Sequence, residues 1–394
     1  MKSKLAIVAL MLMTTFVGFG IIIPVLPQMV SEVSPQSANW HTGAMLTLYS
    51  LASFLLSPVW GSLSEKIGRR PVIMTGVLGF CVSFLLFGLA DGNLTIMYAS
   101  RLLGGLFSGA VTASIVAYVA DITTEEERTK GMAVVGMSIG LGFTFGPFVG
   151  GVLSEVSLNT PFYVAAGLSL LTFIAAWTRL QESMTPERRA EAASRKRVSR
   201  WTAFQGSLKY LYVLAFFVTF SLAILEATLQ LFGMDKFNVT PLNIGMMFFF
   251  CGLVGALIQG GVVRRRVKKG QEGIYIAVGL VISAVGFFLL LTAKSWLLAT
   301  VYLCIFGIGN ALIRPCVTSL ITQKTTVGQG IASGLSSSMD SLGRIVGPVL
   351  GAALLGLQSW LPFLVSGLLS LAALGLLARF RSADRAAQQA QTQA

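Results

Sequence analysis

The chain has 394 residues, of which 54% are hydrophobic and only 11% are charged. A soluble domain carries about 25% charged residues, so this composition indicates a membrane protein and argues against a soluble domain. The formal net charge of +13 alone would also suit a nucleic-acid-binding protein, but its distribution along the chain argues against that.

Twelve apolar segments, each long enough to cross a bilayer as a helix, follow one another along the chain. They form two groups of six, and we predict an all-α integral membrane protein with two six-helix bundles. The first group covers about residues 5–26, 41–60, 72–90, 95–118, 131–153 and 160–179. The second group covers about residues 210–232, 242–263, 273–292, 296–319, 331–356 and 361–379.

The predicted parts of the chain are a first bundle, a cytoplasmic linker, a second bundle and a disordered cytoplasmic tail, at residues 1–180, 181–209, 210–380 and 381–394. With the N-terminus inside, Lys236 and Lys294 are the only two of the 29 lysines and arginines that fall in outer loops. We therefore expect both termini in the cytoplasm. The basic charge is then a topology signal and an attraction to anionic lipids, and not a nucleic-acid surface.

Cysteine and histidine give little indication of chemistry. The four cysteines lie inside apolar segments, and no cysteine or histidine pair has the spacing of metal ligands. We expect neither a metal site nor a disulfide framework. The single histidine, His41, is interpreted as incidental.

The loop after the second segment reads GSLSEKIGRRP, starting at Gly61. Gly61 and Gly68 are expected to allow a tight turn, with Arg69 and Arg70 at the cytoplasmic headgroups. Glu65 can pair with a basic group or a helix N-terminus across the loop. Such a pair would be a latch that holds one conformation and opens in another. The alternative is an ordinary basic inner loop.

The fourth segment contains Arg101, followed at spacings of four by Gly105 and Gly109. An arginine inside a hydrophobic segment is costly, so it usually faces a cavity or a partner. At the inner end of the segment, Asp121 and Arg128 are interpreted as structural residues.

The fifth segment contains GMSIGLGFTFGPFVGG, which is uncharged. Glycines at spacings near four line one side of a helix and let a neighbouring helix approach backbone to backbone; they are at 136, 140, 146 and 150. Pro147 is expected to introduce a kink. The more specific pattern, G-x-x-x-G-P-x-x-G-G, consists of Gly142, Gly146, Pro147, Gly150 and Gly151. A tightly packed helix pair is the alternative to a functional motif.

Five ionisable residues fall inside predicted helices: Arg101, Glu226, Arg314, Asp340 and Arg344. Proton-coupled transport needs a carboxylate whose protonation changes during the cycle. Glu226 has no basic residue near it in the sequence, so it is the best candidate for binding both a proton and a cationic substrate. A structural carboxylate is the alternative. Asp340 and Arg344 are four residues apart and face the same way, either as a permanent ion pair or as a functional switch.

Three of these motifs resemble signatures of the major facilitator superfamily. The loop from Gly61 resembles the signature G-x-L-a-D-r-x-G-r-r-x, with Glu65 in place of the usual Asp. The pattern from Arg101 resembles the fourth-helix motif, whose arginine is implicated in proton transfer. The pattern ending at Gly151 resembles the antiporter motif of drug exporters. The two halves also echo each other at an offset close to 200 residues. This resemblance implies a substrate site near the bilayer midplane, between the two halves.

The whole chain resembles the twelve-helix multidrug exporters of Gram-positive bacteria, which are drug:proton antiporters that expel quinolones and cationic dyes. GIIIPVLP in the first segment, Glu226 and the sequence IRP that contains Arg314 are shared features. Relatives have an acidic residue three positions before that arginine, where this chain has Ala311. They generally have uncharged polar residues where this chain has Asp340 and Arg344. Whether Asp340 replaces the missing acid stays open.

The resemblance implies a cavity lined mainly by the first, fourth, seventh and tenth helices, with the second, fifth, eighth and eleventh at its sides. Aromatic rings there suit flat or cationic lipophilic substrates. Phe16 and Phe143 match aromatic contacts in such exporters, while most of the 26 phenylalanines must face lipid. The candidate substrate contacts are Phe16, Tyr49, Phe143, Phe220, Glu226, Phe306 and Asn310.

The sequence therefore favours proton-driven export of lipophilic, often cationic, small molecules by alternating access, by a monomeric carrier in the cell membrane. Protons are the coupling ion, no other cofactor is expected, and no nucleophile–base constellation indicates an enzyme. The alternative is a narrow exporter of an endogenous metabolite, sugar or lipid on the same fold, which the absence of an acid at Ala311 favours. A membrane sensor is disfavoured because no sizeable soluble domain accompanies the helices.

Overall fold

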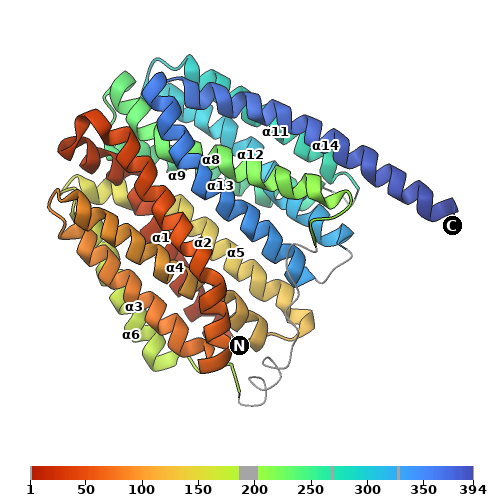
Figure 1. Cartoon of the computed structure of the whole chain (residues 1–394), viewed down its shortest axis with the longest axis horizontal. Helices are drawn as coiled ribbons and strands as arrows, with labels where there is room; N and C mark the ends of the chain where they lie inside the picture. The colour runs from red at the N-terminus through yellow and green to blue at the C-terminus, as the bar shows by residue number, and fades with distance from the viewer. Residues whose placement is uncertain (1, 186–202, 268–269, 326–328, 394) are drawn as a thin grey trace. The chain divides into compact units, whose positions relative to one another are not determined.

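The structure is a computed structural model that describes residues 2–185, 203–267, 270–325 and 329–393. Within these ranges, twelve helices are long and apolar enough to cross a membrane, and no strand occurs. The prediction of an all-α protein with twelve membrane-crossing helices is confirmed. The chain divides into two compact units (Figure 1): residues 1–196 with 239–249, and residues 197–238 with 250–394.

The first unit contains the helices of the first half of the chain. They are α1 (Lys2–Val33), α2 (Ala38–Ile67), α3 (Arg69–Gly88), α4 (Leu94–Ile122), α5 (Glu125–Ser154) and α6 (Thr160–Arg179), with a 3₁₀ turn, η1 (Pro35–Ser37), before α2. Helix α1 packs on α5, α2 packs on α4, and α3 packs on both α4 and α6. The start of the next membrane span, residues 239–249, also belongs to this unit.

The second unit contains the remaining helices. They are α8 (Leu208–Phe237), the rest of α9 (Pro241–Ile258), the π-helical turn η3 (Gln259–Val263), α10 (Arg264–Arg266), α11 (Glu272–Leu291), α12 (Trp296–Lys324), α13 (Gln329–Leu357) and α14 (Leu361–Gln393). Helix α8 packs on α12, α13 and α14, and α11 packs on α12 and α14.

Most helices extend beyond the apolar segments that predict them. Hydropathy marks only the part of a helix that matches the lipid, whereas backbone hydrogen bonding continues into polar residues at either end. Prolines do not end the helices either: Pro147 lies inside α5, which runs unbroken from Glu125 to Ser154. Neighbouring helices in membranes commonly satisfy the groups that a proline frees.

The expectation of a disordered tail after Arg381 is wrong. Helix α14 continues to Gln393, because the tail is rich in alanine and glutamine, which favour helix, and because extending an existing helix needs no new nucleus. Lys324 Nζ at the end of α12 also lies 2.6 Å from Asp384 Oδ2, which ties the start of the tail to the second unit.

Candidate functional site

Two ion pairs join α8, α12 and α13 inside the second unit. Arg344 Nη1 donates a hydrogen bond of 3.0 Å to Glu226 Oε2, linking α13 to α8. Arg314 Nη2 lies 3.7 Å from Asp340 Oδ2, linking α12 to α13. Thr219 Oγ1 on α8 donates a hydrogen bond to the other Asp340 oxygen. All four charged residues lie within helices that qualify as membrane spans.

Of the two alternatives for Asp340 and Arg344, the permanent ion pair between them is not among the ion pairs found in the described part of the chain, and the functional switch stays a prediction. They lie one turn apart on α13, but each reaches an oppositely charged group on another helix. Glu226, which has no basic neighbour in the sequence, has Arg344 as its partner in space. The sequence spacing shows that two side chains share a helix face, but it does not show what the facing helices present to them.

Close packing of α13 on α8 brings the charges within reach. Gly343 and Gly347 sit directly against the α8 backbone: a Cβ on Gly343 would lie 2.8 Å from the nitrogen of Phe220, and one on Gly347 would lie 2.9 Å from its oxygen. Gly351 continues the row against Thr228. Small residues at this spacing are a usual way for membrane helices to approach each other. The spacing of four was the signal in the sequence that could have identified this contact.

The two ion pairs differ in exposure. The side chains of Glu226 and Arg344 are 8% and 20% exposed, whereas those of Asp340 and Arg314 are 35% and 45% exposed. A charged group that is exposed deep within a membrane span faces a water-filled cavity rather than lipid. Among the described residues, the Arg314 guanidinium makes its only ion-pair contact at 3.7 Å and donates no hydrogen bond.

Gln230 is a polar residue that the sequence analysis did not single out. It lies one turn along α8 from Glu226 and is 1% exposed. Neither atom of its amide has a hydrogen-bond partner within the described part of the chain. A buried amide in this state has unused donors and acceptors for water or a ligand.

Two candidate substrate contacts, Phe306 and Asn310, line a pocket inside the second unit. The pocket lies among α8, α11, α12 and α14, and its polar wall includes Ser283 and Ser221. The Oδ1 atom of Asn310 and the Oγ atom of Ser283 have no hydrogen-bond partner among the described residues. Two of these helices, α11 and α14, are not among those expected to line a cavity, so the resemblance did not predict this pocket.

Phe220 does not line that pocket. It is 4% exposed, and its ring stacks on that of Phe216 with 5.5 Å between the ring centroids. Its backbone is the surface against which Gly343 and Gly347 pack. In this structure Phe220 therefore serves the α8–α13 contact.

The candidate aromatic residues of the first unit form one cluster. The ring of Phe16 on α1 lies 5.3 Å from that of Phe143 on α5. Phe19, which the sequence analysis did not single out, bridges them to the third candidate: its ring lies 5.5 Å from Phe143 and 5.3 Å from Tyr49. Phe19 follows Phe16 by three residues, so it shares a helix face with it.

The glycine motif of α5 packs against the backbone of α1. Gly142 packs against Phe16, and Gly146 packs against Gly20. A Cβ on Gly150 would lie 2.7 Å from the backbone oxygen of Ile21. The adjacent Gly151 lies against Pro241 and Leu242 at the start of α9, within the same unit. The motif therefore places Phe143 beside Phe16.

The glycines of α5 that contact α1 differ from those expected from the sequence. Gly136 and Gly140 have no neighbouring atom within 4 Å of a Cβ position, so the row begins at Gly142 and repeats every four residues. The expected row combined spacings of four and six, and only its last two members pack on α1.

Arg101 is buried in the first unit without an acidic partner. It is 1% exposed, its guanidinium lies 4.6 Å from the centre of the Phe87 ring, and Nη2 donates a long hydrogen bond of 3.4 Å to Ser100 Oγ. Within the described residues it makes no ion pair, and its Nε has no hydrogen-bond partner. A cation over an aromatic face is a favourable arrangement when both are desolvated.

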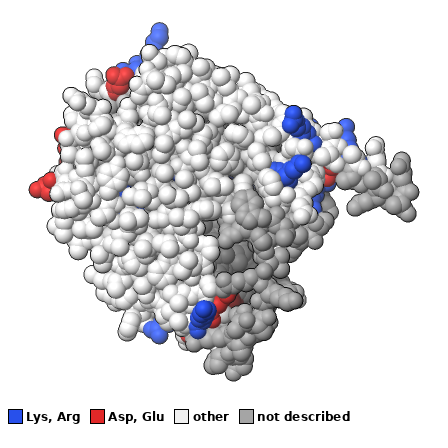
Figure 2. Space-filling model, viewed as in Figure 1, with Lys and Arg blue, Asp and Glu red and all other residues white. Residues whose placement is uncertain are grey.

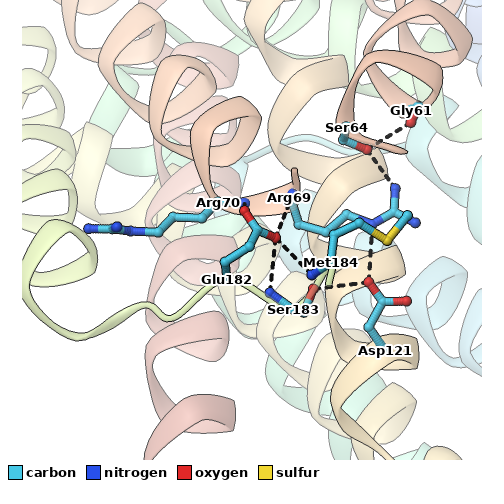
Figure 3. A network of polar contacts seen from close by, with 8 residues as sticks. All are labelled: Gly61, Ser64, Arg69, Arg70, Asp121, Glu182, Ser183 and Met184. Atoms are coloured by element: carbon cyan, nitrogen blue, oxygen red, sulfur yellow. Dashed lines mark hydrogen bonds and ion pairs between the residues drawn. The ribbon is translucent and has the colours of Figure 1, made fainter. Parts of the chain in front are cut away.

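A polar network at one end of the first unit joins α2, α3, α4 and the segment after α6 (Figure 3). Glu182 accepts hydrogen bonds from the backbone nitrogens of Arg69, Arg70, Ser183 and Met184 at 2.9–3.1 Å. A carboxylate at this place satisfies free N–H groups at the start of α3 and complements the helix dipole. The sequence analysis assigned Glu182 to the linker and missed this role, although an acid directly after a helix was visible in the sequence.

Arg69 is the centre of the same network (Figure 3). Its Nε lies 3.1 Å from Asp121 Oδ2, and its Nη1 donates to Ser64 Oγ at 2.6 Å. Ser183 also donates to Asp121 Oδ2, at 3.0 Å. Arg69 is only 7% exposed, so the expectation that it stays at the lipid headgroups is wrong. The interpretation of Asp121 as structural fits this geometry.

The other residues of the predicted latch are placed differently. Glu65 makes no hydrogen bond or ion pair with any residue that the structure describes, so the expected pairing is not seen. Gly61 lies inside α2, whereas Gly68, with φ of +113°, forms the turn into α3. Arg70 donates to the backbone oxygen of Trp177 at 2.7 Å. The side chain of Arg128 is outside the described set.

The surface supports a membrane location. The face seen in Figure 2 is largely uncharged, and lysine, arginine, aspartate and glutamate lie mainly at its margins. Large exposed apolar side chains include Leu171, Trp177 and Leu257, each more than 60% exposed. Such surface is costly in water and suits contact with lipid.

Comparison with known proteins gives a consistent set of relatives. The family model described as "Major Facilitator Superfamily" matches residues 8–332. Multidrug resistance protein 2 of Bacillus subtilis (strain 168) is 31% identical over 366 residues, covering 92% of this chain and 91% of the relative. Quinolone resistance protein NorA of Staphylococcus aureus is 28% identical over 361 residues, covering 90% of each chain.

Solved structures agree in fold. The human organic anion transporter MFSD10 (TETRAN) is similar with a TM-score of 0.73 and 25% identity, covering 95% of this chain and 99% of that one. A bacterial homolog of the human lysosomal transporter Spinster gives a TM-score of 0.74 at 13% identity, covering 97% of each chain.

Proposed function

The chain belongs to the Major Facilitator Superfamily, and we propose that it exports lipophilic small molecules from the cytoplasm in exchange for protons by alternating access. It is a multi-pass membrane protein, and its relatives include multidrug and quinolone resistance proteins. The cell membrane, cytoplasmic termini and a monomeric state are part of the proposal, which the concentration of basic residues in the predicted inner loops supports.

The observation that carries the proposal is the buried pair of Glu226 and Arg344 across α8 and α13. The carboxylate is 8% exposed and lies 3.0 Å from Arg344, its one basic partner in the described part of the chain. Protonation of Glu226 would remove half of this pair and weaken the contact between the two helices. Removing one member of a buried ion pair costs several kcal/mol, roughly 3–5, which is enough to shift a conformational equilibrium strongly.

Proton coupling then follows from the protonation of Glu226, which opens its pair with Arg344. A proton arriving from outside would neutralise the carboxylate and release the substrate, and loss of the proton to the cytoplasm would restore the pair. Asp340 and Arg314 form a second, more exposed pair that takes part in the same cycle. Arg101 has no acidic partner in the described part of its unit, and we assign it a supporting role.

The test uses the purified full chain in liposomes that contain a pH-sensitive dye. An inward proton gradient is imposed, a lipophilic dye substrate is added, and wild type is compared with Glu226→Gln and Asp340→Asn. Substrate-dependent proton flux that disappears in Glu226→Gln supports the proposal. Loss in both variants assigns coupling to both carboxylates. Absence of flux in folded wild type contradicts proton-coupled drug export.

A narrow exporter of an endogenous metabolite, sugar or lipid is the second candidate. Ala311 favours it, because this position lacks the acid expected of multidrug exporters, and one similar structure is titled an organic anion transporter. Drug susceptibility of cells with and without the protein, measured over unrelated compounds, separates the two. Protection against a single chemical class favours the narrow exporter.

A further inference from the structure

We propose that Arg314 binds an anionic group, most simply a carboxylate, on the transported molecule. The inference rests on the proposed function and specifies its substrate class: lipophilic compounds that carry a carboxylate, rather than simple lipophilic cations. Two observations support it: the state of the Arg314 guanidinium and the bonding of its partner, Asp340.

The charge balance gives little preference for a cation. The described intramembrane charges of α8, α12 and α13 are two acids and two arginines, matched as Glu226 with Arg344 and Asp340 with Arg314. A cationic substrate must therefore displace an arginine before it can contact either carboxylate. A substrate carboxylate must likewise displace Asp340 from Arg314, so the charge balance favours neither sign, and the accessibility and hydrogen bonding of the paired groups decide between them.

Arg314 is the group best placed to accept such an exchange. Its side chain is 45% exposed, although it lies well inside the span from Trp296 to Lys324. The contact with Asp340 is 3.7 Å, too long for a hydrogen bond. A guanidinium has five N–H donors in a planar fork that matches a carboxylate in two parallel hydrogen bonds. Within the described residues, none of these donors is used.

Arg344 is less accessible to a ligand carboxylate than Arg314. It already donates a short hydrogen bond to Glu226, and its side chain is 20% exposed. Displacing Glu226, which is 8% exposed, would leave a carboxylate away from water and without its partner. The exposed pair is therefore the one that a ligand can open at lower free energy.

Asp340 remains stabilised when Arg314 turns to a ligand. Its Oδ1 atom accepts a hydrogen bond from Thr219, and its side chain is 35% exposed. Water can therefore take the place of the arginine. A freed Asp340 also presents a carboxylate next to the bound ligand, where an ammonium group of a zwitterionic compound would be stabilised. A proton on Asp340 would compete with that ammonium group, as an exchange of protons for substrate requires.

The experiment compares a quinolone that has a free carboxylate with its methyl ester, which has the same ring system without the anionic charge. Binding to the purified full chain in lipid nanodiscs is followed by the ligand's own fluorescence. The variants are Arg314→Gln, Arg314→Lys, and Arg314→Gln combined with Asp340→Asn, which leaves no unpaired acid. Arg266→Gln is the matched control, because Arg266 is an exposed arginine in α10, at the end of the candidate span from Pro241 to Arg266. Size-exclusion profiles establish that each variant is folded.

We expect wild type and Arg266→Gln to bind the acid at least about tenfold more tightly than the ester, as a charge-assisted pair would give. Arg314→Gln and the double variant should lose this preference by weakening acid binding alone, and Arg314→Lys should keep part of it. Equal affinity for acid and ester in wild type would overturn the inference. So would a double variant that binds the acid as wild type does, or a variant that weakens both ligands equally.

A transport arm separates this inference from the proposed function. The same preparations, reconstituted in liposomes, are tested with a permanently cationic lipophilic dye that has no carboxylate. Proton-coupled dye transport without any acid preference would overturn the role of Arg314 and leave export intact. Acid-selective binding without proton-coupled transport of either compound would instead contradict the proposed exchange function.

Discussion

The three intramembrane arginines have different surroundings, and these surroundings indicate their roles. Arg101 is almost fully buried over the ring of Phe87, Arg344 bonds to Glu226, and Arg314 is half-exposed with a long contact to Asp340. The first two side chains are held by the protein, whereas the third is available to a ligand. The residue type alone does not distinguish them, because only the facing helices decide what each guanidinium contacts.

At this scale, the Glu226–Arg344 pair should show strong coupling. Arg344→Gln leaves Glu226 as a carboxylate without its partner, and we expect it to destabilise the protein by roughly 3 kcal/mol. The double variant with Glu226→Gln should recover much of this loss, because neither charge is then left unmatched. Thermal unfolding in detergent measures both. If the effects of the two substitutions on the free energy of unfolding are additive, the two side chains have no coupling free energy.

At the scale of helices, glycine rows determine which elements approach closely. Gly142, Gly146 and Gly150 seat α5 on α1, and Gly343, Gly347 and Gly351 seat α13 on α8. Lipid gives little hydrophobic driving force between helices, so close packing of small residues carries much of the association. Both rows position candidate site residues: the aromatic pair of Phe16 and Phe143, and the two ion pairs.

Gly146→Val tests the first row. The new side chain would collide with Gly20, since even a Cβ would lie 2.8 Å from its Cα. We expect a clear fall in melting temperature and loss of transport. Gly140→Val, on the same helix with no atom within 4 Å of a Cβ, should be close to wild type in both. Equal effects of the two substitutions would show that helix propensity, and not the contact with α1, is responsible.

The N-terminus of α3 gives a second prediction at this scale. Glu182→Ala removes the acceptor of four backbone N–H groups, and we expect the free energy of unfolding to fall by about 1–2 kcal/mol, with faster amide exchange at Arg69, Arg70, Ser183 and Met184. Glu155→Ala removes an exposed carboxylate elsewhere in the unit and should leave this exchange unchanged. Unaltered exchange in Glu182→Ala would mean that water replaces the carboxylate without loss.

At the scale of the whole molecule, the chain consists of two compact units of membrane-crossing helices, and its membrane topology can be tested directly. With the four native cysteines replaced, a cysteine at position 159 should react with a membrane-impermeant maleimide in intact cells. A cysteine at position 382 should react only after the cells are opened. Labelling of position 382 in intact cells would contradict the cytoplasmic C-terminus.

The sequence predicts some parts of this structure well and others poorly, for physical reasons. The number and places of the spans follow from lipid matching. The family resemblance named Phe16 and Phe143 as substrate contacts, which stays a prediction, and it did not predict that their rings contact each other. The partners of Glu226, Asp340 and Arg344 were not predictable, because they depend on which helices face each other. Glu182 was missed because its acceptor role depends on the chain turning back to the start of α3.

The matching of the two intramembrane acids, Glu226 and Asp340, to arginines on other helices also constrains how the protein can evolve. A single substitution in the buried pair leaves an unmatched charge, so Glu226 and Arg344 should be exchanged together or not at all. The exposed pair of Arg314 and Asp340 tolerates single changes better, because water can compensate. Selection for a new substrate range should therefore first yield substitutions at Arg314 or Asp340, while the buried pair is inherited unchanged.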